Sequence, residues 1–305
     1  MNLTSPSQVK AWCIENDFHP NKVLGQNFLI DQNALLAIVD AGLGEVGLES
    51  AAGETHRGTE LAESVPRCVS PAALPKPRVL EIGPGMGVLT EEMLKRGCEV
   101  TAIEKDPVLA ERLAASLGNP PNLTVIAGDA LEVIAAAGRR DRSVASLLDL
   151  SSFDAMVSNL PYQAGTRILL DLVLLRAVSS MTVLVQTEVA DRLAAKEGSK
   201  VRGLAGVWAQ LDYDVKIVRK VAASCFWPRP AIGSTVVKLT RHDRNAGLTT
   251  EERDMFHRLT KQAFEHRRKQ LGSIFKDLIQ STARAEELSN EDWIELAKGL
   301  THADT

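Results

Sequence analysis

Short apolar runs alternate with longer amphipathic stretches between residues 78 and 240. The runs have the length of strands and the stretches that of helices, an order typical of βαβ units in a parallel sheet with helices on both faces. We expect seven strands, at residues 78–82, 99–103, 123–127, 153–158, 181–186, 213–221 and 234–239. The sequence therefore predicts an α/β fold built on a mostly parallel sheet.

An insertion interrupts the alternation before the first of these strands. Residues 42–77 are rich in Gly, Ala, Ser, Glu and Pro and show no period. Segments of this length without secondary structure are uncommon inside a compact domain. We therefore interpret the middle of the segment, residues 48–75, as an exposed insertion.

A change of pattern after Leu248 indicates a second domain. Strand signals end there, and Thr249 or Thr250 followed by two glutamates is typical of a helix start. We expect three helices, at residues 249–264, 267–279 and 290–296. The chain is thus predicted to form a large α/β domain, residues 1–248, and a small helical domain, residues 249–305.

Composition is that of an ordinary globular protein, with 45% hydrophobic and 24% charged residues. No apolar run reaches the ~20 residues that cross a bilayer, and residues 1–20 lack the apolar stretch of a signal peptide. The four cysteines are scattered singly, without the spacing of a zinc site. We therefore expect a cytoplasmic monomer with no membrane partner and no metal site.

Charge is distributed unevenly along the chain. The whole sequence carries a formal net charge of −4, from 35 basic and 39 acidic residues. Residues 216–276 alone contain 14 Lys and Arg against 5 Asp and Glu, a net charge of +9. An acidic body with one basic segment indicates a surface that can bind phosphates.

The strongest local signal is a strand that runs into three alternating glycines. Glu81 precedes Gly83, Gly85 and Gly87, and a helical pattern follows. Glycines let the backbone turn tightly and approach a ligand, which in doubly wound sheets lies beyond the carboxyl ends of the strands. The G-x-G-x-G spacing differs from that of dinucleotide enzymes and resembles the nucleoside-binding turn of class I S-adenosylmethionine methyltransferases. A purely structural turn is the alternative.

Acidic residues end the next two predicted strands. Glu104 follows Gly87 by 17 residues, close to the ~20 at which a carboxylate binds ribose hydroxyls in this fold. Asp129 ends the third strand, where a carboxylate can accept a hydrogen bond from an adenine amino group. Either residue is also suited to cap a helix, and for Asp129, which precedes Ala130, both roles stay open.

Asn159-Leu160-Pro161-Tyr162 follows the fourth strand at the same edge of the sheet. It fits the methylation of an exocyclic amine, which is a poor nucleophile because its lone pair is delocalised into the ring. An Asn oxygen and a neighbouring main-chain carbonyl can accept the two N–H bonds and favour a pyramidal nitrogen, while Tyr162 stacks on the flipped-out base. An activated methyl donor demands positioning rather than a strong general base. The alternative is a turn that only closes the strand.

Taken together, these motifs resemble the ribosomal RNA adenine N6,N6-dimethyltransferase family and are similar to its bacterial small-subunit branch. The resemblance covers residues 9–280 apart from the insertion, and its motifs lie at residues 22–29, 81–87, 104, 128–130, 159–162 and 226–230. It implies a Rossmann-like class I methyltransferase domain, S-adenosyl-L-methionine as cofactor, and small-subunit ribosomal RNA or a pre-ribosomal small subunit as partner. The large-subunit branch and a mitochondrial transcription-factor branch share much of the same core.

The resemblance also implies roles for the residues that match. The cofactor-binding residues would be Asn27, Leu29, Gly83, Gly85, Glu104, Asp129 and Asn159. The catalytic residues would be Asn159, Leu160, Pro161, Tyr162 and Phe226. Phe226 would face the target base opposite Tyr162, or else be an ordinary core residue. The RNA-binding residues would be Arg267, Arg268 and Lys269, for which a solvated helix face is the alternative.

We hypothesise an enzyme that dimethylates N6 of adenosines in small-subunit ribosomal RNA during ribosome biogenesis. One alternative is an RNA-binding assembly or transcription factor with a retained methyltransferase fold, and another is a large-subunit rRNA adenine methyltransferase. A nucleotide-dependent oxidoreductase is disfavoured by the missing G-x-G-x-x-G. The wall that would face RNA departs from the family pattern, since Arg202 stands where an aromatic residue is common.

Overall fold

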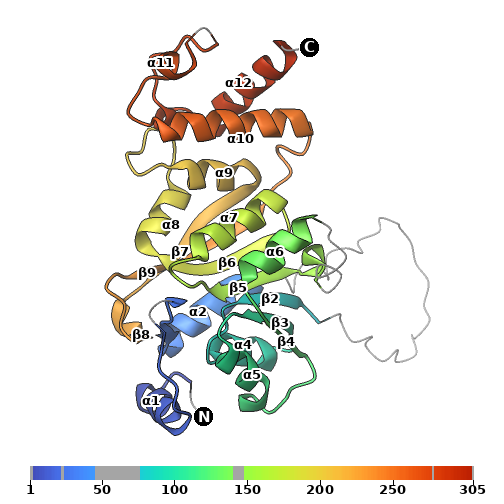
Figure 1. Ribbon diagram of the computed structural model, residues 1–305, viewed down its shortest axis with the longest axis vertical. Coiled ribbons are helices and arrows are strands. Elements are labelled where there is room, and N and C mark those ends of the chain that lie inside the picture. Colours follow the sequence, from blue (N-terminus) through green and yellow to red (C-terminus); the bar gives the residue numbers. More distant parts are fainter. Residues whose placement is uncertain (1–2, 22–23, 45–75, 140–147, 277, 304–305) are drawn as a thin grey trace, which may run out of the picture.

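The computed structural model describes residues 3–21, 24–44, 76–139, 148–276 and 278–303. The predicted insertion, residues 48–75, lies outside the described residues. Figure 1 shows an elongated molecule whose central sheet lies between helix α1 (Pro6–Glu15) at one end and the C-terminal helices at the other. Within the described residues, no helix combines the length and the apolar character needed to cross a bilayer.

The central sheet has seven strands in the order β4-β3-β2-β5-β6-β9-β7. Their bounds are β2 (Arg78–Ile82), β3 (Glu99–Glu104), β4 (Leu123–Ala127), β5 (Ala155–Asn159), β6 (Ser180–Gln186), β7 (Tyr213–Val221) and β9 (Ser234–Arg241). Strand β9 is antiparallel to both of its neighbours, and the other pairs are parallel. The predicted α/β fold with a mostly parallel sheet is confirmed.

Alternating side chains along the strands build one apolar layer on each face of the sheet. Val79 packs with helices on one face, and its neighbour Leu80 packs with helices on the other. The first face is covered by α2 (Gln32–Leu43) and α4 (Val88–Lys95), the second by α6 (Ala130–Arg139), α7 (Gly165–Leu175), α8 (Thr187–Ala194) and α9 (Leu204–Asp212). Both faces are thereby buried, so the carboxyl ends of the strands are the accessible edge.

A short second sheet ties the N-terminal segment to the loop before β9. Strand β1 (Phe28–Leu29) pairs antiparallel with β8 (Phe226–Trp227). Asp31 then caps α2 by accepting a hydrogen bond from Ala34 N at 2.8 Å. Helix α5 (Pro107–Ser116) packs beside α1 in a small apolar cluster that includes Phe28.

The C-terminal part contains α10 (Thr250–Glu265), α11 (Leu271–Phe275) and α12 (Asn290–Ala303). Thr249 and Glu252 form a capping box at the start of α10, so the predicted helix start is confirmed. Buried Phe256 and Trp293 pack with Val207 of α9, and the C-terminal helices therefore share a core with the sheet-covering layer.

The expected helix at residues 267–279 was wrong, because only Leu271–Phe275 is helical. Gln270 has an extended backbone and pairs with Arg284 in an isolated β-bridge, which ends any helix that would start at Arg267. Lys276 has a φ of 42°, in the left-handed region, and stops the helix on the other side. A long-range backbone pairing thus overrides the local helical pattern.

Candidate active site

A pocket opens at the carboxyl ends of strands β2 to β5, with about 1190 Å³ of empty space including its open mouth. Its walls include the glycine turn, the ends of β3 and β5, the start of α6, and the N-terminal residues 24–29. Every predicted cofactor-binding residue lines this pocket, and so do all predicted catalytic residues except Phe226. Five segments that are separate in sequence therefore meet at one edge of the sheet.

The glycine turn has backbone conformations that favour glycine. Gly83, Gly85 and Gly87 have φ angles of 70°, 58° and 90°. A Cβ on Gly85 would lie 3.1 Å from the Phe28 ring, and a Cβ on Gly87 would lie 2.6 Å from Leu113. Gly85 and Gly87 therefore leave little room for a side chain, and the main chain at Gly83 and Gly85 lines the pocket directly.

Glu104 ends β3 and is fixed by two main-chain donors. Its Oε2 accepts a hydrogen bond from Gly85 N at 3.0 Å, and its Oε1 accepts one from Asp106 N at 2.8 Å. Burial raises the pKa of Glu104, and the main-chain donors oppose that effect. Each carboxylate oxygen keeps a second acceptor position, so a ligand can still donate two hydrogen bonds to this residue.

Asp129 is held by both of its oxygens. Oδ1 accepts a hydrogen bond from Leu131 N at 2.9 Å, which is the helix cap that the sequence allowed. Oδ2 lies 2.7 Å from Lys105 Nζ, and this hydrogen bond lowers the pKa of the Asp129 carboxyl. Asp129 can cap the helix and still bind an adenine amino group, because an ionised carboxylate has further acceptor positions. Adenine binding by Asp129 stays a prediction.

Asn159 ends β5 with its side-chain amide oriented by the N-terminal segment. Its Nδ2 donates a hydrogen bond to the carbonyl of Asn27 at 3.1 Å. Oδ1 has no hydrogen-bond partner among the described residues. The bond to Asn27 therefore leaves the amide oxygen as the free acceptor at the pocket wall.

Tyr162 follows β5 and is anchored by a residue of another strand, β9. Its hydroxyl lies 2.5 Å from the hydroxyl of Ser234, a fully buried residue that begins β9. Burial raises the pKa of Tyr162. A Cβ on Gly25 would lie 3.3 Å from Tyr162 N, so the N-terminal segment crosses directly over this turn. Tyr162 is thus held at its hydroxyl end and lines the pocket.

Phe226 is not brought to the pocket. It is 2% exposed and packs with Leu29 and Val236 in the apolar layer beneath β1 and β8. Its neighbour Trp227 stacks on Phe28 with ring centroids 6.5 Å apart. The predicted base contact of Phe226 stays a prediction, and the core position is the one that the structure describes.

The three predicted RNA-binding residues lie in the turn after α10, away from the pocket lining. Arg268 and Lys269 are exposed. Arg267 is half-buried and points inward, since its Nη2 donates to the carbonyl of Lys200 at 2.5 Å and its Nε lies 3.5 Å from Glu286 Oε2. The segment therefore presents two free cations and one that joins two parts of the fold.

Sequence reasoning missed several residues that shape the pocket. Gln26 Nε2 donates to Asp106 Oδ2 at 2.8 Å and fastens the N-terminal segment over the glycine turn. Glu81 is 1% exposed and accepts a hydrogen bond from Thr90 Oγ1 at 2.6 Å, and burial raises its pKa to about 8. An acidic residue inside an apolar strand is a sequence signal that could have pointed to Glu81. No local pattern marks Ser234, which anchors Tyr162.

The pocket suits a cationic nucleoside such as S-adenosyl-L-methionine. The acidic side chains of Glu104 and Asp129 line it, and the side-chain-free main chain at Gly83 and Gly85 permits close approach of a flat or extended ligand. Acidic acceptors favour a ligand rich in hydroxyl and ammonium donors and carrying positive charge. The donor set and the glycine cradle therefore fit this cofactor.

Comparison with known proteins agrees with this geometry. The model of the ribosomal RNA adenine dimethylase family matches residues 17–298. A protein of Deinococcus radiodurans named ribosomal RNA small subunit methyltransferase A is 39% identical, over 78% of this chain and 67% of its own length. A protein of the same name from Bifidobacterium longum (strain DJO10A) is 32% identical, over 98% of this chain and 94% of its own.

Solved structures share the fold. A dimethyladenosine transferase from Plasmodium falciparum superposes with a TM-score of 0.66 at 20% identity, over 90% of this chain and 98% of that one. The 23S rRNA methyltransferase ErmE superposes with a TM-score of 0.56 at 19% identity, over 89% and 98%. With the family model spanning both the pocket and the C-terminal helices, the chain belongs to the ribosomal RNA adenine dimethylase family.

Proposed function

We propose that this protein transfers two methyl groups in succession to N6 of adenosines in small-subunit ribosomal RNA. The reaction belongs to ribosome biogenesis, and the protein acts in the cytoplasm, where its RNA partner is assembled. S-adenosyl-L-methionine supplies a methyl group already activated by a sulfonium. The chain therefore has to hold the cofactor, extract the base and orient the amine.

The observation that carries this proposal is the orientation of the Asn159 amide. Because Nδ2 donates to Asn27, Oδ1 is left to accept an N–H bond of the target amine. The carbonyl of Pro161 accepts Gly165 N at 2.7 Å, whereas the carbonyl of Leu160 has no main-chain donor among the described residues. Oδ1 of Asn159 and the Leu160 carbonyl thus supply the two acceptors that a pyramidal nitrogen needs.

The remaining pocket residues bind either the target base or the cofactor. Tyr162 stacks on the extruded adenine, with its ring held by Ser234. Glu104 accepts the ribose hydroxyls, and Asp129 accepts the adenine amino group of the cofactor. Asn27, Leu29 and the glycine turn enclose its methionine portion. Neutral exocyclic amines need no strong base here, since the proton leaves after the methyl group has been accepted.

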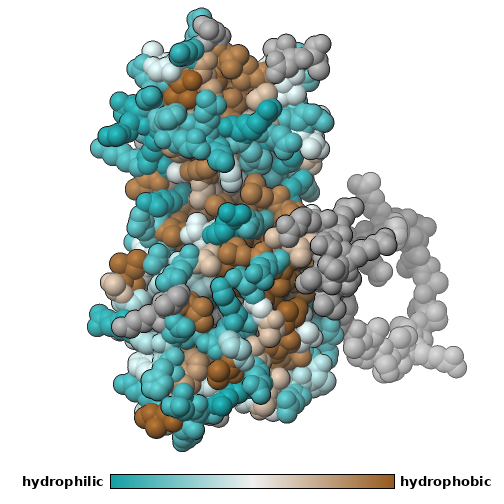
Figure 2. Space-filling view, viewed as in Figure 1, coloured by the Kyte–Doolittle hydropathy of each residue, from teal (hydrophilic) through white to brown (hydrophobic). Residues whose placement is uncertain are grey.

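The C-terminal helices, residues 249–305, serve as the RNA-contacting domain in this proposal. Arg268 and Lys269 are exposed, and residues 249–276 contain 7 Lys and Arg against 4 Asp and Glu. Figure 2 shows a mainly hydrophilic surface over α10. Cations on such a surface bind the phosphate backbone and place the RNA without reading its sequence.

Methyl transfer to isolated particles tests the proposal. The protein, incubated with labelled S-adenosyl-L-methionine and immature small subunits, should produce N6,N6-dimethyladenosine in small-subunit RNA. Asn159→Ala should lower the rate by roughly 10²–10³, as loss of one transition-state hydrogen bond does, and leave cofactor affinity within a few-fold. Asn33→Ala, which changes an exposed Asn of α2, is the matched control and should keep the full rate.

Each alternative has its own signature in this assay. Normal cofactor binding with no methylated nucleoside would contradict the proposal and favour an assembly factor with a retained methyltransferase fold. In a parallel reaction that contains large-subunit RNA, dimethyladenosine in that RNA and none in small-subunit RNA would assign the chain to the large-subunit activity.

A further inference from the structure

The loop between α8 and α9, residues 195–203, is bonded to the C-terminal helices at several points. Gly198 N donates to the carbonyl of Glu286 at 2.8 Å. Arg267 Nη2 donates to the carbonyl of Lys200 at 2.5 Å. These bonds cross from the sheet-covering layer to the part of the chain that carries the exposed cations, so the loop forms a polar joint between the two.

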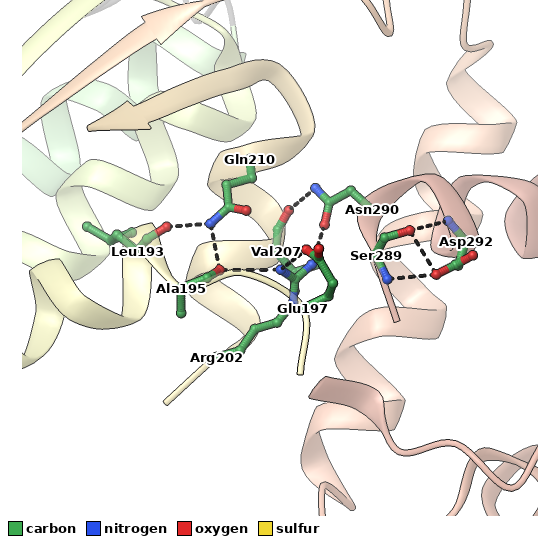
Figure 3. A network of polar contacts seen from close by, with 9 residues as sticks. All are labelled: Leu193, Ala195, Glu197, Arg202, Val207, Gln210, Ser289, Asn290 and Asp292. Atoms are coloured by element: carbon green, nitrogen blue, oxygen red, sulfur yellow. Dashed lines mark hydrogen bonds and ion pairs between the residues drawn. The ribbon is translucent and has the colours of Figure 1, made fainter. Parts of the chain in front are cut away.

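Arg202 is the centre of this joint. It is 1% exposed, and its guanidinium donates to the carbonyl of Ala195 at 3.3 Å and to Asn290 Oδ1 at 2.9 Å (Figure 3). Asn290, the first residue of α12, also donates from Nδ2 to the carbonyl of Val207 at 2.9 Å. The side-chain amide of Asn290 therefore bonds to Arg202 and to Val207 of α9, which both precede the C-terminal helices.

The burial of Arg202 is poorly compensated. The nearest carboxylate oxygen, on exposed Glu197, is 3.9 Å away, and the Arg202 Nε has no partner among the described residues. Burial lowers the pKa of Arg202, which reflects the loss of solvation. A buried cation without a close counter-ion adds little net stability, and an apolar side chain of similar size is commonly as stable. Stabilisation alone does not explain this residue.

The hydrogen bonds of Arg202 add a preferred orientation of the C-terminal helices relative to α9. The shared apolar core of α9, Phe256 and Trp293 holds the two parts together, but apolar contact does not depend on direction. Hydrogen bonds do, because they weaken steeply with angle. The bond between Arg202 and Asn290 therefore orients α12 over α9, while the bonds from Arg253 of α10 to Asp212 orient α10.

We propose that Arg202 and Asn290 are positioning residues for the RNA substrate, which fix the distance and direction between the base pocket and the exposed cations Arg268 and Lys269. This inference rests on the proposed function. Arg267 belongs to the joint rather than to the phosphate-binding surface, since its donors are directed to Lys200 and Glu286. One RNA molecule can then place its target base in the pocket while its phosphate backbone contacts Arg268 and Lys269.

Binding of a transcribed small-subunit ribosomal RNA at several salt concentrations tests the inference. Arg202→Met should weaken binding about tenfold and lower the slope of log Kd against log salt by roughly 1.5, the equivalent of two phosphate contacts. Affinity for S-adenosyl-L-methionine should not change. Arg192→Met, which removes a neighbouring arginine whose partner Glu188 lies on the same helix, is the matched control and should bind RNA normally.

A second background separates positioning from mere loss of folding. In the Arg268→Ala/Lys269→Ala protein, Arg202→Met should have no further effect on RNA affinity, whereas a folding defect would lower affinity again. Asn290→Ala should reproduce the effect, and it replaces Arg202→Met if that variant does not fold. Unchanged RNA affinity and salt slope in both variants would overturn the inference. Failure of the wild-type protein to methylate RNA would instead overturn the proposed function.

Discussion

Glu81→Gln is expected to make the protein more stable near neutral pH. The Glu81 carboxyl is 1% exposed, and its hydrogen bond from Thr90 does not compensate for its burial. Burial raises its pKa from 4.5 to about 8. Glutamine has nearly the shape of the protonated acid, can accept the same bond from Thr90, and cannot ionise.

The magnitude follows from the linkage between protonation and folding. Between pH 4.5 and 8 the folded protein holds a proton on Glu81 that the unfolded chain has released, so stability falls as the pH rises. Each pH unit in this window lowers the free energy of unfolding by ~1.4 kcal/mol. At pH 7 the ionisable side chain therefore costs about 3 kcal/mol, and at pH 5 less than ~1 kcal/mol. Glu81→Gln removes this cost.

Urea unfolding at pH 5, 6 and 7, without cofactor, measures the difference between variant and wild type. That difference should grow by about 2.5 kcal/mol from pH 5 to pH 7 in favour of Glu81→Gln. Thr90→Val removes the hydrogen bond but keeps the titrating group, and it should retain the pH slope of the wild type. A constant difference between Glu81→Gln and wild type across this range would show that Glu81 ionises normally in the folded protein, and would refute the reasoning.

Three further changes test other contacts. Gly206→Ala would place a Cβ 2.3 Å from the main-chain oxygen of Arg192, and it should lower the free energy of unfolding by at least ~2 kcal/mol in urea titration. Tyr162→Phe removes the bond to Ser234, and it should slow single-turnover methylation roughly tenfold with unchanged cofactor affinity; a wild-type rate would contradict the anchoring role. Asp129→Asn should weaken cofactor binding about tenfold in calorimetry, because the neutral amide is a weaker acceptor than the carboxylate and loses the ion pair with Lys105.

Predictions that depended on local patterns agree with the structure. The seven strands, the helix start at Thr249 and the tight turn at the three glycines all follow from residues close in sequence. Parallel strands bring their carboxyl ends to one edge, so the meeting of Glu104, Asp129 and Asn159 also followed once the strand order was inferred.

Contacts between distant segments were not predictable in this way. The pairing of Phe28 with Trp227 joins segments about 200 residues apart, and it places Phe226 in the core. The bridge between Gln270 and Arg284 shortens a helix that the periodic pattern favoured. In both cases a backbone pairing formed by the folded chain overrides a local preference that is worth less.

The amino-acid order by itself determined the kind of sheet, the glycine turn and the set of polar residues that end the strands, because each depends on spacing along a few residues. Only the folded structure decided which atom of Asn159 is free, that Arg267 faces inward, and that Arg202 is buried in a joint. Those outcomes depend on partners more than 60 residues away, and a side chain's direction is set by the partners that surround it. The residue types of the site could therefore be predicted from the sequence, whereas the directions of their side chains are set by the folded structure.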